Sequence, residues 1–142
     1  MMSRYLRIFG LSSISILFFF EIALASIDAN NRAAGATTNY TYSFNASVDS
    51  LASFTISFPG AFNVQGVLIA ASTTMDGGFD VSAPSGNQFT ITRDGAGTDT
   101  PSGNQDLIFG VVTNPTTAGN YSITITGAVS ESPTINITSA AL

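Results

Sequence analysis

Residues 106–127 read DLIFGVVTNPTTAGNYSITITG, and this stretch decides the expected fold. An apolar run at 107–112 is followed by turn residues at 114–119 and then by a run at 121–126 in which apolar and polar residues alternate. Alternation is typical of a strand with one buried face, and a short apolar run between turns is typical of a strand buried on both faces. We therefore expect two neighbouring strands, the apolar one central in its sheet.

The rest of the chain carries the same kinds of run. Further strand candidates lie at 40–48, 52–58, 64–71, 79–82, 88–93 and 134–138. The run at 64–71 is expected to be buried on both faces, and residues 94–105 are expected to form a long polar loop. Many short strands without an amphipathic helix indicate an all-β sandwich or barrel. Its expected core comprises Phe44, Phe54, Phe58, Phe62, Phe79, Phe89, Phe109, Ile56, Ile69, Ile91, Ile108, Ile123 and Ile125.

The N-terminal segment has the pattern of a secretory signal peptide. Arg4 and Arg7 precede an apolar stretch at 8–20, and Ala23-Leu24-Ala25 offers the small residues of a cleavage site. A membrane anchor left uncut is the alternative, although the apolar stretch is short for a membrane span. We expect a secreted or cell-surface protein, or a periplasmic one in a Gram-negative cell. The expected domains are a signal peptide at 1–25, a flexible lead-in at 26–37 and a β-sandwich at 38–142.

The composition after residue 25 excludes several functions. These 117 residues carry two arginines against eight carboxylates, and they contain no Lys, His, Cys or Trp. Without a basic patch we expect no binding to nucleic acid or to an anionic membrane surface. Without His or Cys, neither a zinc site of the usual kind nor a Ser-His-Asp triad can form. We therefore expect no enzyme; the alternative that composition leaves open is a glycoside hydrolase with paired carboxylates.

Two segments resemble a known family. Residues 54–60 (FTISFPG) look like a strand ending in Phe-Pro-Gly, and Asn114-Pro115 precedes the alternating run at 119–126 (GNYSITIT). Both are similar to immunoglobulin-like modules of bacterial and archaeal surface-layer and adhesin-type proteins, over residues 33–126. The resemblance implies an immunoglobulin-like antiparallel β-sandwich of about 7–9 strands and a structural or adhesive role outside the cell. Such modules usually occur in tandem arrays, whereas this chain has one.

A carboxylate-rich region suggests a calcium site. The expected ligands are Asp94, Asp99 and Asp106, with the backbone carbonyls of Gly95, Gly97 and Thr98. Ca²⁺ takes about six to eight oxygen ligands and suits extracellular β-modules. The alternative is ordinary turn chemistry, because the spacing matches no EF-hand loop and Asp-Gly is a common turn pair.

Asparagines and tyrosines supply two further hypotheses. The sequence contains four Asn-x-Ser/Thr glycosylation sequons, at Asn39, Asn45, Asn120 and Asn136. Tyr40, Tyr42 and Tyr121 could form a sugar-stacking surface, but Tyr40 and Tyr42 share the parity of Phe44, which favours packing in the core.

Together these patterns predict a secreted, non-enzymatic structural or adhesive protein of the cell surface or extracellular matrix. Its partner would be another copy of itself, joined by strand addition through residues 26–38 or 134–138, or another surface protein. The alternative is a carbohydrate- or protein-binding module that uses the loop at 94–105.

Overall fold

The computed structural model describes residues 24–141, which contain ten strands and no helix. Of the expected signal peptide, residues 1–23 lie outside the described part. The strands are β1 (Ser26–Ala29), β2 (Thr37–Val48), β3 (Ser53–Ser57), β4 (Ile69–Ala71), β5 (Phe79–Val81), β6 (Gln88–Arg93), β7 (Thr100–Thr113), β8 (Gly119–Ser122), β9 (Thr124–Gly127) and β10 (Thr134–Ile137). All the strand pairs that form sheets are antiparallel.

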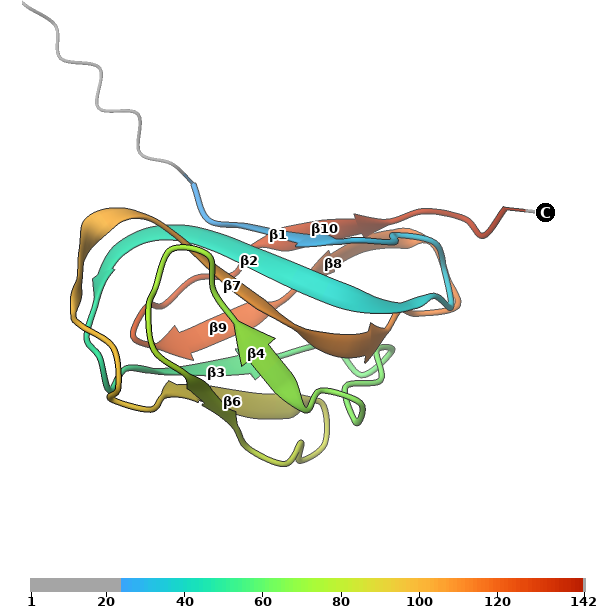
Figure 1. Ribbon diagram of the computed structural model, residues 1–142. Helices are drawn as coiled ribbons and strands as arrows, with labels where there is room; N and C mark the ends of the chain where they lie inside the picture. The colour runs from blue at the N-terminus through green and yellow to red at the C-terminus, as the bar shows by residue number, and fades with distance from the viewer. Residues whose placement is uncertain (1–23, 142) are drawn as a thin grey trace, which may run out of the picture.

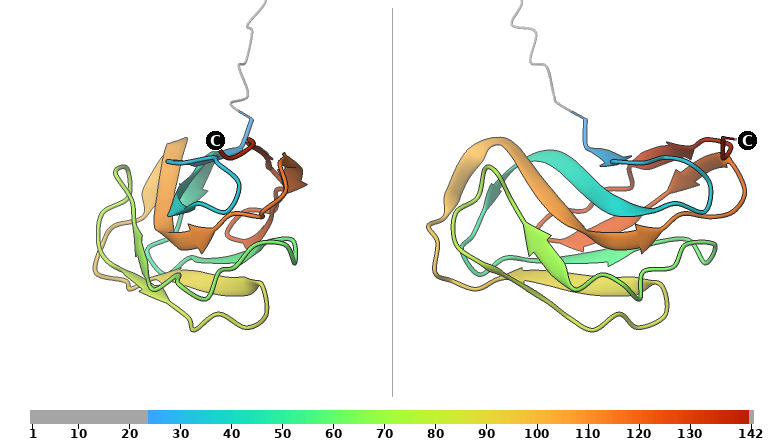
Figure 2. Two further views of the ribbon diagram at one scale, coloured as in Figure 1. Left: turned by 90° about the vertical axis from the view of Figure 1, so that its right-hand side faces the viewer. Right: turned by 45° about the vertical axis from the view of Figure 1, so that its right-hand side comes forward.

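Two four-stranded sheets lie face to face (Figures 1 and 2). One has the strand order β1-β2-β7-β4 and the other β5-β6-β3-β9. A separate pair, β10-β8, lies along one side of the molecule next to β1. The expectation of an all-β antiparallel sandwich is confirmed.

The alternating runs form the centre of both sheets. In β2 the alternation places Tyr40, Tyr42 and Phe44 inward, and Tyr40 pairs with Phe109 of β7. In the opposite sheet, Ile56 of β3 lies between Phe89 of β6 and Ile125 of β9 in the strand register. These side chains meet in one apolar core, as their period of two requires.

Most of the predicted core residues are buried, but three are not. Phe79 and Ile108 are half-buried, and the side chain of Ile69 is 68% exposed. The run at 64–71 is not a strand buried on both faces: only Ile69–Ala71 form a strand, and it is the edge strand of its sheet. Val64 and Val67 reach the core from a turn closed by a hydrogen bond from Val67 N to Val64 O, which leaves the following residues outside.

The flexible lead-in predicted at 26–37 is wrong for its first four residues. Ser26–Ala29 form β1, which pairs with β2, and Ile27 and Ala29 are buried. The loop predicted at 94–105 is wrong from Thr100 onward, because β7 begins there and pairs with the far end of β2 at Val48. In both places the long strand β2 supplies a row of backbone partners that the local sequence does not reveal.

The two strands expected to be neighbours within 106–127 are not adjacent. β7 lies between β2 and β4, while the alternating run is divided at Ile123 into β8, which pairs with β10, and β9, which pairs with β3. The crossover therefore carries the chain out of the first sheet. The apolar strand is central in its sheet, as predicted.

Candidate interaction surfaces

One end of the sandwich is organised by the buried side chain of Arg93. Along β6 the inward positions are Phe89, Ile91 and Arg93, so the guanidinium lies where the core ends, with 2% of the residue exposed. Nη1 donates to the carbonyl oxygens of Val48 (3.2 Å) and Asp49 (3.0 Å). Backbone carbonyls thus accept hydrogen bonds from the terminal nitrogens of Arg93, while its buried Nε has no hydrogen-bond partner in the structure.

The second terminal nitrogen of Arg93 binds two further loops. Nη2 donates to the backbone oxygens of Asp76 (2.9 Å) and Thr98 (2.8 Å) and, at 3.2 Å, to the Asp76 carboxylate. Three segments that are distant in the chain, at 48–49, 76 and 98, therefore share one cation. Arg93 acts as a structural hub for this end of the molecule.

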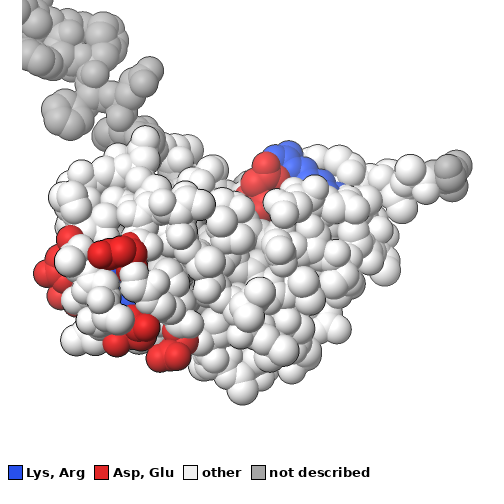
Figure 3. Space-filling model, viewed as in Figure 1, with Lys and Arg blue, Asp and Glu red and all other residues white. Residues whose placement is uncertain are grey.

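The carboxylates around this hub, which gather at the left end of the molecule in Figure 3, accept backbone hydrogen bonds. Asp76 accepts from Thr98 N (2.9 Å), Asp94 from Ala96 N (2.9 Å) and Gly78 N (3.1 Å), and Asp99 from Ser50 N (2.8 Å). These backbone bonds hold the pKa of each carboxyl below its usual value of 3.8. The acids stabilise the loops in their ionised form.

Asp106, the third predicted calcium ligand, has partners of its own. Its carboxylate accepts hydrogen bonds from the hydroxyls of Ser72 (2.8 Å) and Thr73 (2.6 Å) and from Thr73 N (2.7 Å). Although burial opposes the shift, these bonds leave the pKa of Asp106 below its ordinary value. Asp106 thereby fastens the segment after β4 to β7.

The predicted calcium ligands are therefore held by separate partners. Within the described part of the chain, no three His, Cys, Asp or Glu side chains form a group that could hold a metal ion. The Thr98 carbonyl, expected as a ligand, accepts from Arg93. Calcium binding stays a prediction.

If Arg93 alone organises these loops, we expect EDTA to leave the melting temperature of calcium-treated protein unchanged. A fall in melting temperature that added Ca²⁺ reverses would instead establish a calcium site.

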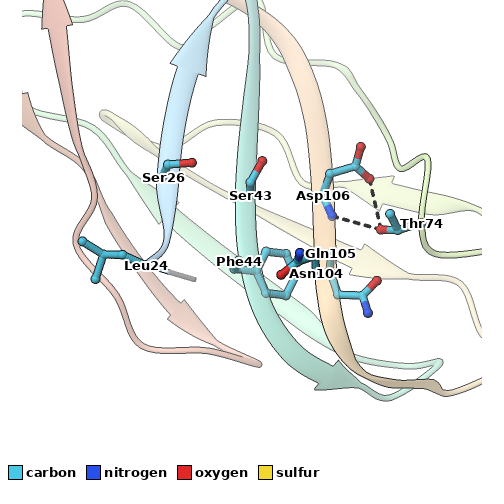
Figure 4. Close-up of a pocket in the computed structure, with 8 residues that line it drawn as sticks. All are labelled: Leu24, Ser26, Ser43, Phe44, Thr74, Asn104, Gln105 and Asp106. Carbon is cyan, nitrogen blue, oxygen red and sulfur yellow. Dashed lines mark hydrogen bonds between the residues drawn. The ribbon is translucent and has the colours of Figure 1, made fainter. Parts of the chain in front are cut away.

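A shallow hollow of about 360 Å³ lies over the outer face of β1, β2 and β7 (Figure 4). Its lining combines the apolar side chains of Leu24 and Phe44 with polar residues that include Ser26, Asn104 and Asp106. Gln105 also borders it; this residue is buried, its Nε2 donates to Pro101 O (3.2 Å), and its Oε1 has no hydrogen-bond partner. The hollow offers neutral hydroxyl and amide groups. Its one carboxylate, that of Asp106, already accepts hydrogen bonds from Ser72 and Thr73.

A second polar surface covers the outer face of β3 and β6. Ser53 pairs with Thr92 (2.9 Å), Thr55 with Thr90 (3.1 Å), and the Ser57 hydroxyl donates to Gln88 Oε1 (3.0 Å). Such cross-strand pairs stabilise the sheet. They also present an uncharged, hydroxyl-rich face to solvent.

Three of the four sequon asparagines are exposed. Asn45 on β2 donates to Asn104 Oδ1 (3.1 Å), and Asn136 on β10 donates to Asn120 Oδ1 on β8 (2.7 Å). Asn39 is half-buried and lies against Gly110, where an added Cβ would come within 2.0 Å of its Oδ1. Glycosylation stays a prediction, with Asn45, Asn120 and Asn136 the sterically accessible acceptors.

The tyrosines of β2 are core residues, as their parity predicted. Tyr40 and Tyr42 are 0% exposed, so neither can stack on a sugar. The Tyr40 hydroxyl donates to Asn114 Oδ1 (2.5 Å), and Asn114 Nδ2 donates to the carbonyls of Asn31 and Ala33 (both 2.9 Å). The buried Asn114 therefore ties the crossover after β7 to the segment between β1 and β2, a role that sequence reasoning did not assign.

Buried tyrosines make stability depend on alkaline pH. Burial raises the pKa of Tyr40 and Tyr42 above the ordinary 10.0, and the hydrogen bond from Tyr42 to Glu131 raises that of Tyr42 further. Above pH 10 the unfolded chain releases these protons and the folded protein keeps them. The free energy of unfolding should then fall with rising pH, by up to about 1.4 kcal/mol per pH unit for each tyrosine.

The variant Tyr42→Phe separates this effect from general alkaline damage. With one of the two buried phenols removed, we expect the slope of unfolding free energy against pH, measured by urea denaturation between pH 10 and 11, to decrease by up to about 1.4 kcal/mol per pH unit. Between pH 6 and 8 the two proteins should show parallel profiles. Equal slopes above pH 10 would contradict the burial of the Tyr42 hydroxyl.

Among residues 24–141, no helix is long and apolar enough to cross a membrane. No protein-family model matches the sequence, and no curated protein matches it either.

Solved structures with the same fold exist. BslA, described as a bacterial hydrophobin, has a TM-score of 0.50 at 15% identity, over 82% of this chain and 96% of that one. The N-terminal domain of the Streptococcus gordonii adhesin Sgo0707 has a TM-score of 0.50 at 12% identity, over 82% of this chain and 33% of that one. A Nocardia farcinica protein described as having an immunoglobulin-like fold has a TM-score of 0.49 at 17% identity, over 82% and 98%.

At these identities the likeness shows the fold alone. The chain is an antiparallel β-sandwich, and BslA and the adhesin domain share this fold with it. The resemblance seen in the sequence is thus confirmed for the fold.

Proposed function

We propose that the protein is a non-enzymatic structural or adhesive module of the cell surface or extracellular matrix, which works through contacts with other proteins. The observation that carries this proposal is the Arg93 hub. At the end of the molecule around Arg93, the carboxylates of Asp76, Asp94 and Asp99 accept hydrogen bonds that hold the loops together. Carboxylates whose pKa these bonds lower are poorly matched to general acid or base catalysis near neutral pH.

The outer surfaces support the same role. The outward face of β3 and β6 consists of paired hydroxyl and amide groups, and the loops at the acidic end are fixed by many hydrogen bonds. A rigid surface loses little conformational entropy when a partner binds. A fold that presents such faces on two packed sheets suits a building block better than a catalyst.

The structure bears on the expected route of self-assembly. Residues 26–29 pair with β2, and residues 134–137 pair with β8, all within one chain. Neither segment is a free strand that could add to the sheet of a neighbour. Strand addition through either segment would therefore require its pairing within the chain to open.

The test is genetic and biochemical. In the source organism we expect the protein in the extracellular or surface fraction, and we expect loss of cell–cell or cell–surface attachment when its gene is deleted, restored by the wild-type gene. Retention of the mature protein in the cytoplasm, or unchanged attachment in every assay, would contradict the proposal.

A carbohydrate-binding role is the second candidate, and the hollow in Figure 4 is the observation that favours it. Its neutral amides and hydroxyls could hydrogen-bond to sugar hydroxyls. Binding on a glycan array that is lost in Asn104→Ala and kept in Gln88→Ala, on the opposite sheet, would support this role over assembly.

A further inference from the structure

Cleavage at the predicted site after Ala25 would leave a chain with a single primary amine. Residues 26–142 contain no lysine, so the α-amino group of Ser26 would be the only one. Its ordinary pKa is about 7.7–8.0, and it is therefore mostly protonated at neutral pH. The processed chain would gain a third cation, in addition to Arg32 and Arg93.

The start of β1 borders a second hollow of about 480 Å³. Residues 24–26 form one side of this hollow and residues 131–134 form the other. β1 and β10 lie next to each other (Figure 1), and beyond them Ala33 and Thr138 form a parallel bridge. Followed back toward the N-terminus by the same number of residues, the two segments reach Ser26 and Glu131. The new amine and the Glu131 carboxylate thus belong to opposite sides of one hollow.

Glu131 is held in place by its backbone and by its side chain. Ile125 N donates to Glu131 O (2.9 Å), and Glu131 N donates to Ile125 O (3.0 Å). The carboxylate accepts a hydrogen bond from the hydroxyl of Tyr42, a fully buried residue that pairs with Ile27 of β1. The half-buried Glu131 carboxylate is therefore fixed close to the first residues of β1.

Glu131 has no cationic partner within residues 24–141. The ion pairs in this part of the chain are Arg32 with Asp28 and Arg93 with Asp76, so both arginines already have a carboxylate. An ion pair with a half-buried carboxylate is screened less than one on the open surface. A cation that entered this hollow would therefore find a fixed counter-ion.

We propose that the α-ammonium group of Ser26, formed by cleavage after Ala25, binds to the Glu131 carboxylate in this hollow. Cleavage removes Leu24 and Ala25, which otherwise form part of the wall, and leaves the charged group at the end of β1. The resulting ion pair fastens the edge strand β1 to the segment that precedes β10. This inference rests on the predicted cleavage site and is independent of the proposed function.

The absence of lysine makes the amine easy to observe. Mass spectrometry of the processed protein first shows whether the chain begins at Ser26. Reductive methylation with isotopically labelled formaldehyde then gives one NMR signal, because methylation marks a single amine and keeps its positive charge. We expect the pKa read from this signal to lie about one unit above that of the same group in urea-unfolded protein, because a nearby carboxylate favours the charged form.

Glu131→Gln removes the charge and keeps an oxygen that can accept from Tyr42. This variant should lose the upward shift. Asp106→Asn is the matched control, since Asp106 and Ser26 border the other hollow (Figure 4) and the Asp106 carboxylate already accepts from Ser72 and Thr73. It should leave the amine pKa unchanged. Circular dichroism establishes that both variants keep the fold.

The stability of the two proteins gives a second readout. A raised pKa in the folded state stabilises the protein below the pKa of the unfolded chain, and this contribution disappears as the pH rises through the folded value. The advantage of the wild type over Glu131→Gln in urea denaturation should therefore be present at pH 7 and shrink above pH 9. A purely structural role of the hydrogen bond with Tyr42 would make the difference independent of pH in this range.

Four results would overturn the proposal. They are a processed chain that begins at another residue, an amine pKa equal to that of the unfolded protein, a raised pKa that Glu131→Gln leaves unchanged, and a shift that only Asp106→Asn removes. The last result would place the ammonium group in the other hollow. None of them bears on the attachment phenotype that tests the proposed function.

Discussion

Arg93→Ala is expected to destabilise the fold by about 3–5 kcal/mol, because the substitution removes the only cation from a buried set of carbonyls. The backbone oxygens of Val48, Asp49, Asp76 and Thr98 would each lose a donor at 3.2 Å or less. To regain partners in water the loops at this end must open. Urea denaturation measures the loss, and hydrogen exchange should show new fast-exchanging amides around residues 48–50 and 94–99.

Two variants sharpen this experiment. Arg93→Lys should restore little stability, since one ammonium group cannot span carbonyls that the planar guanidinium reaches from two nitrogens. Arg32→Ala is the control: Arg32 forms an exposed ion pair with Asp28 (2.6 Å), which is worth about 1 kcal/mol or less. Comparable losses for Arg93→Ala and Arg32→Ala would refute the hub.

Phe109→Ala should cost about 3–5 kcal/mol, the range seen when a large aromatic leaves a cavity in a close-packed core. Phe109 is 1% exposed, and its ring lies 5.4 Å from Phe89 and 6.1 Å from Tyr40, centroid to centroid. It therefore contacts aromatic residues of both sheets, and its loss loosens the packing of one sheet on the other. Chemical denaturation gives the free energy.

The neighbouring residue supplies the control for Phe109. Ile108 lies on the outward side of the same strand and is half-buried, so Ile108→Ala removes less buried surface and should cost clearly less. Phe54→Ala, at a 0% exposed position of the other sheet, should match Phe109→Ala. A melt unchanged by either phenylalanine substitution would contradict the proposed core.

The sequence was sufficient to predict the sandwich because its strongest signal, the alternation in β2, β3 and β6, reports directly which side chains face inward. That signal does not report which strands are neighbours. Tyr121, Ile123 and Ile125 keep one parity through β8 and β9, although the chain changes sheets between them. Alternation records burial, and pairing depends on long-range contacts that a local pattern does not contain.

The same limit explains why the role of Arg93 was missed and why Ile69 was expected in the core. Arg93 has the parity of Phe89 and Ile91, a signal for an inward side chain, but its carbonyl partners come from segments far away in the sequence. Ile69 looked like a core residue because its neighbours are apolar. Its exposure follows from the edge position of β4, which only the assembled sheet defines.

The bridge between the two ends of the described chain has a mechanical consequence. The segment after β1 and the segment after β10 run in the same direction at Ala33 and Thr138, joined by hydrogen bonds of 2.9 Å from Ala34 N to Thr138 O and from Thr138 N to Arg32 O. In Figure 1 the chain enters β1 near the middle of the upper edge and leaves beyond β10 at the right. Tension applied through residues 24 and 141 would load these bonds together in shear instead of peeling them one at a time. Under such load the unfolding rate, rather than equilibrium stability, governs how long the module holds.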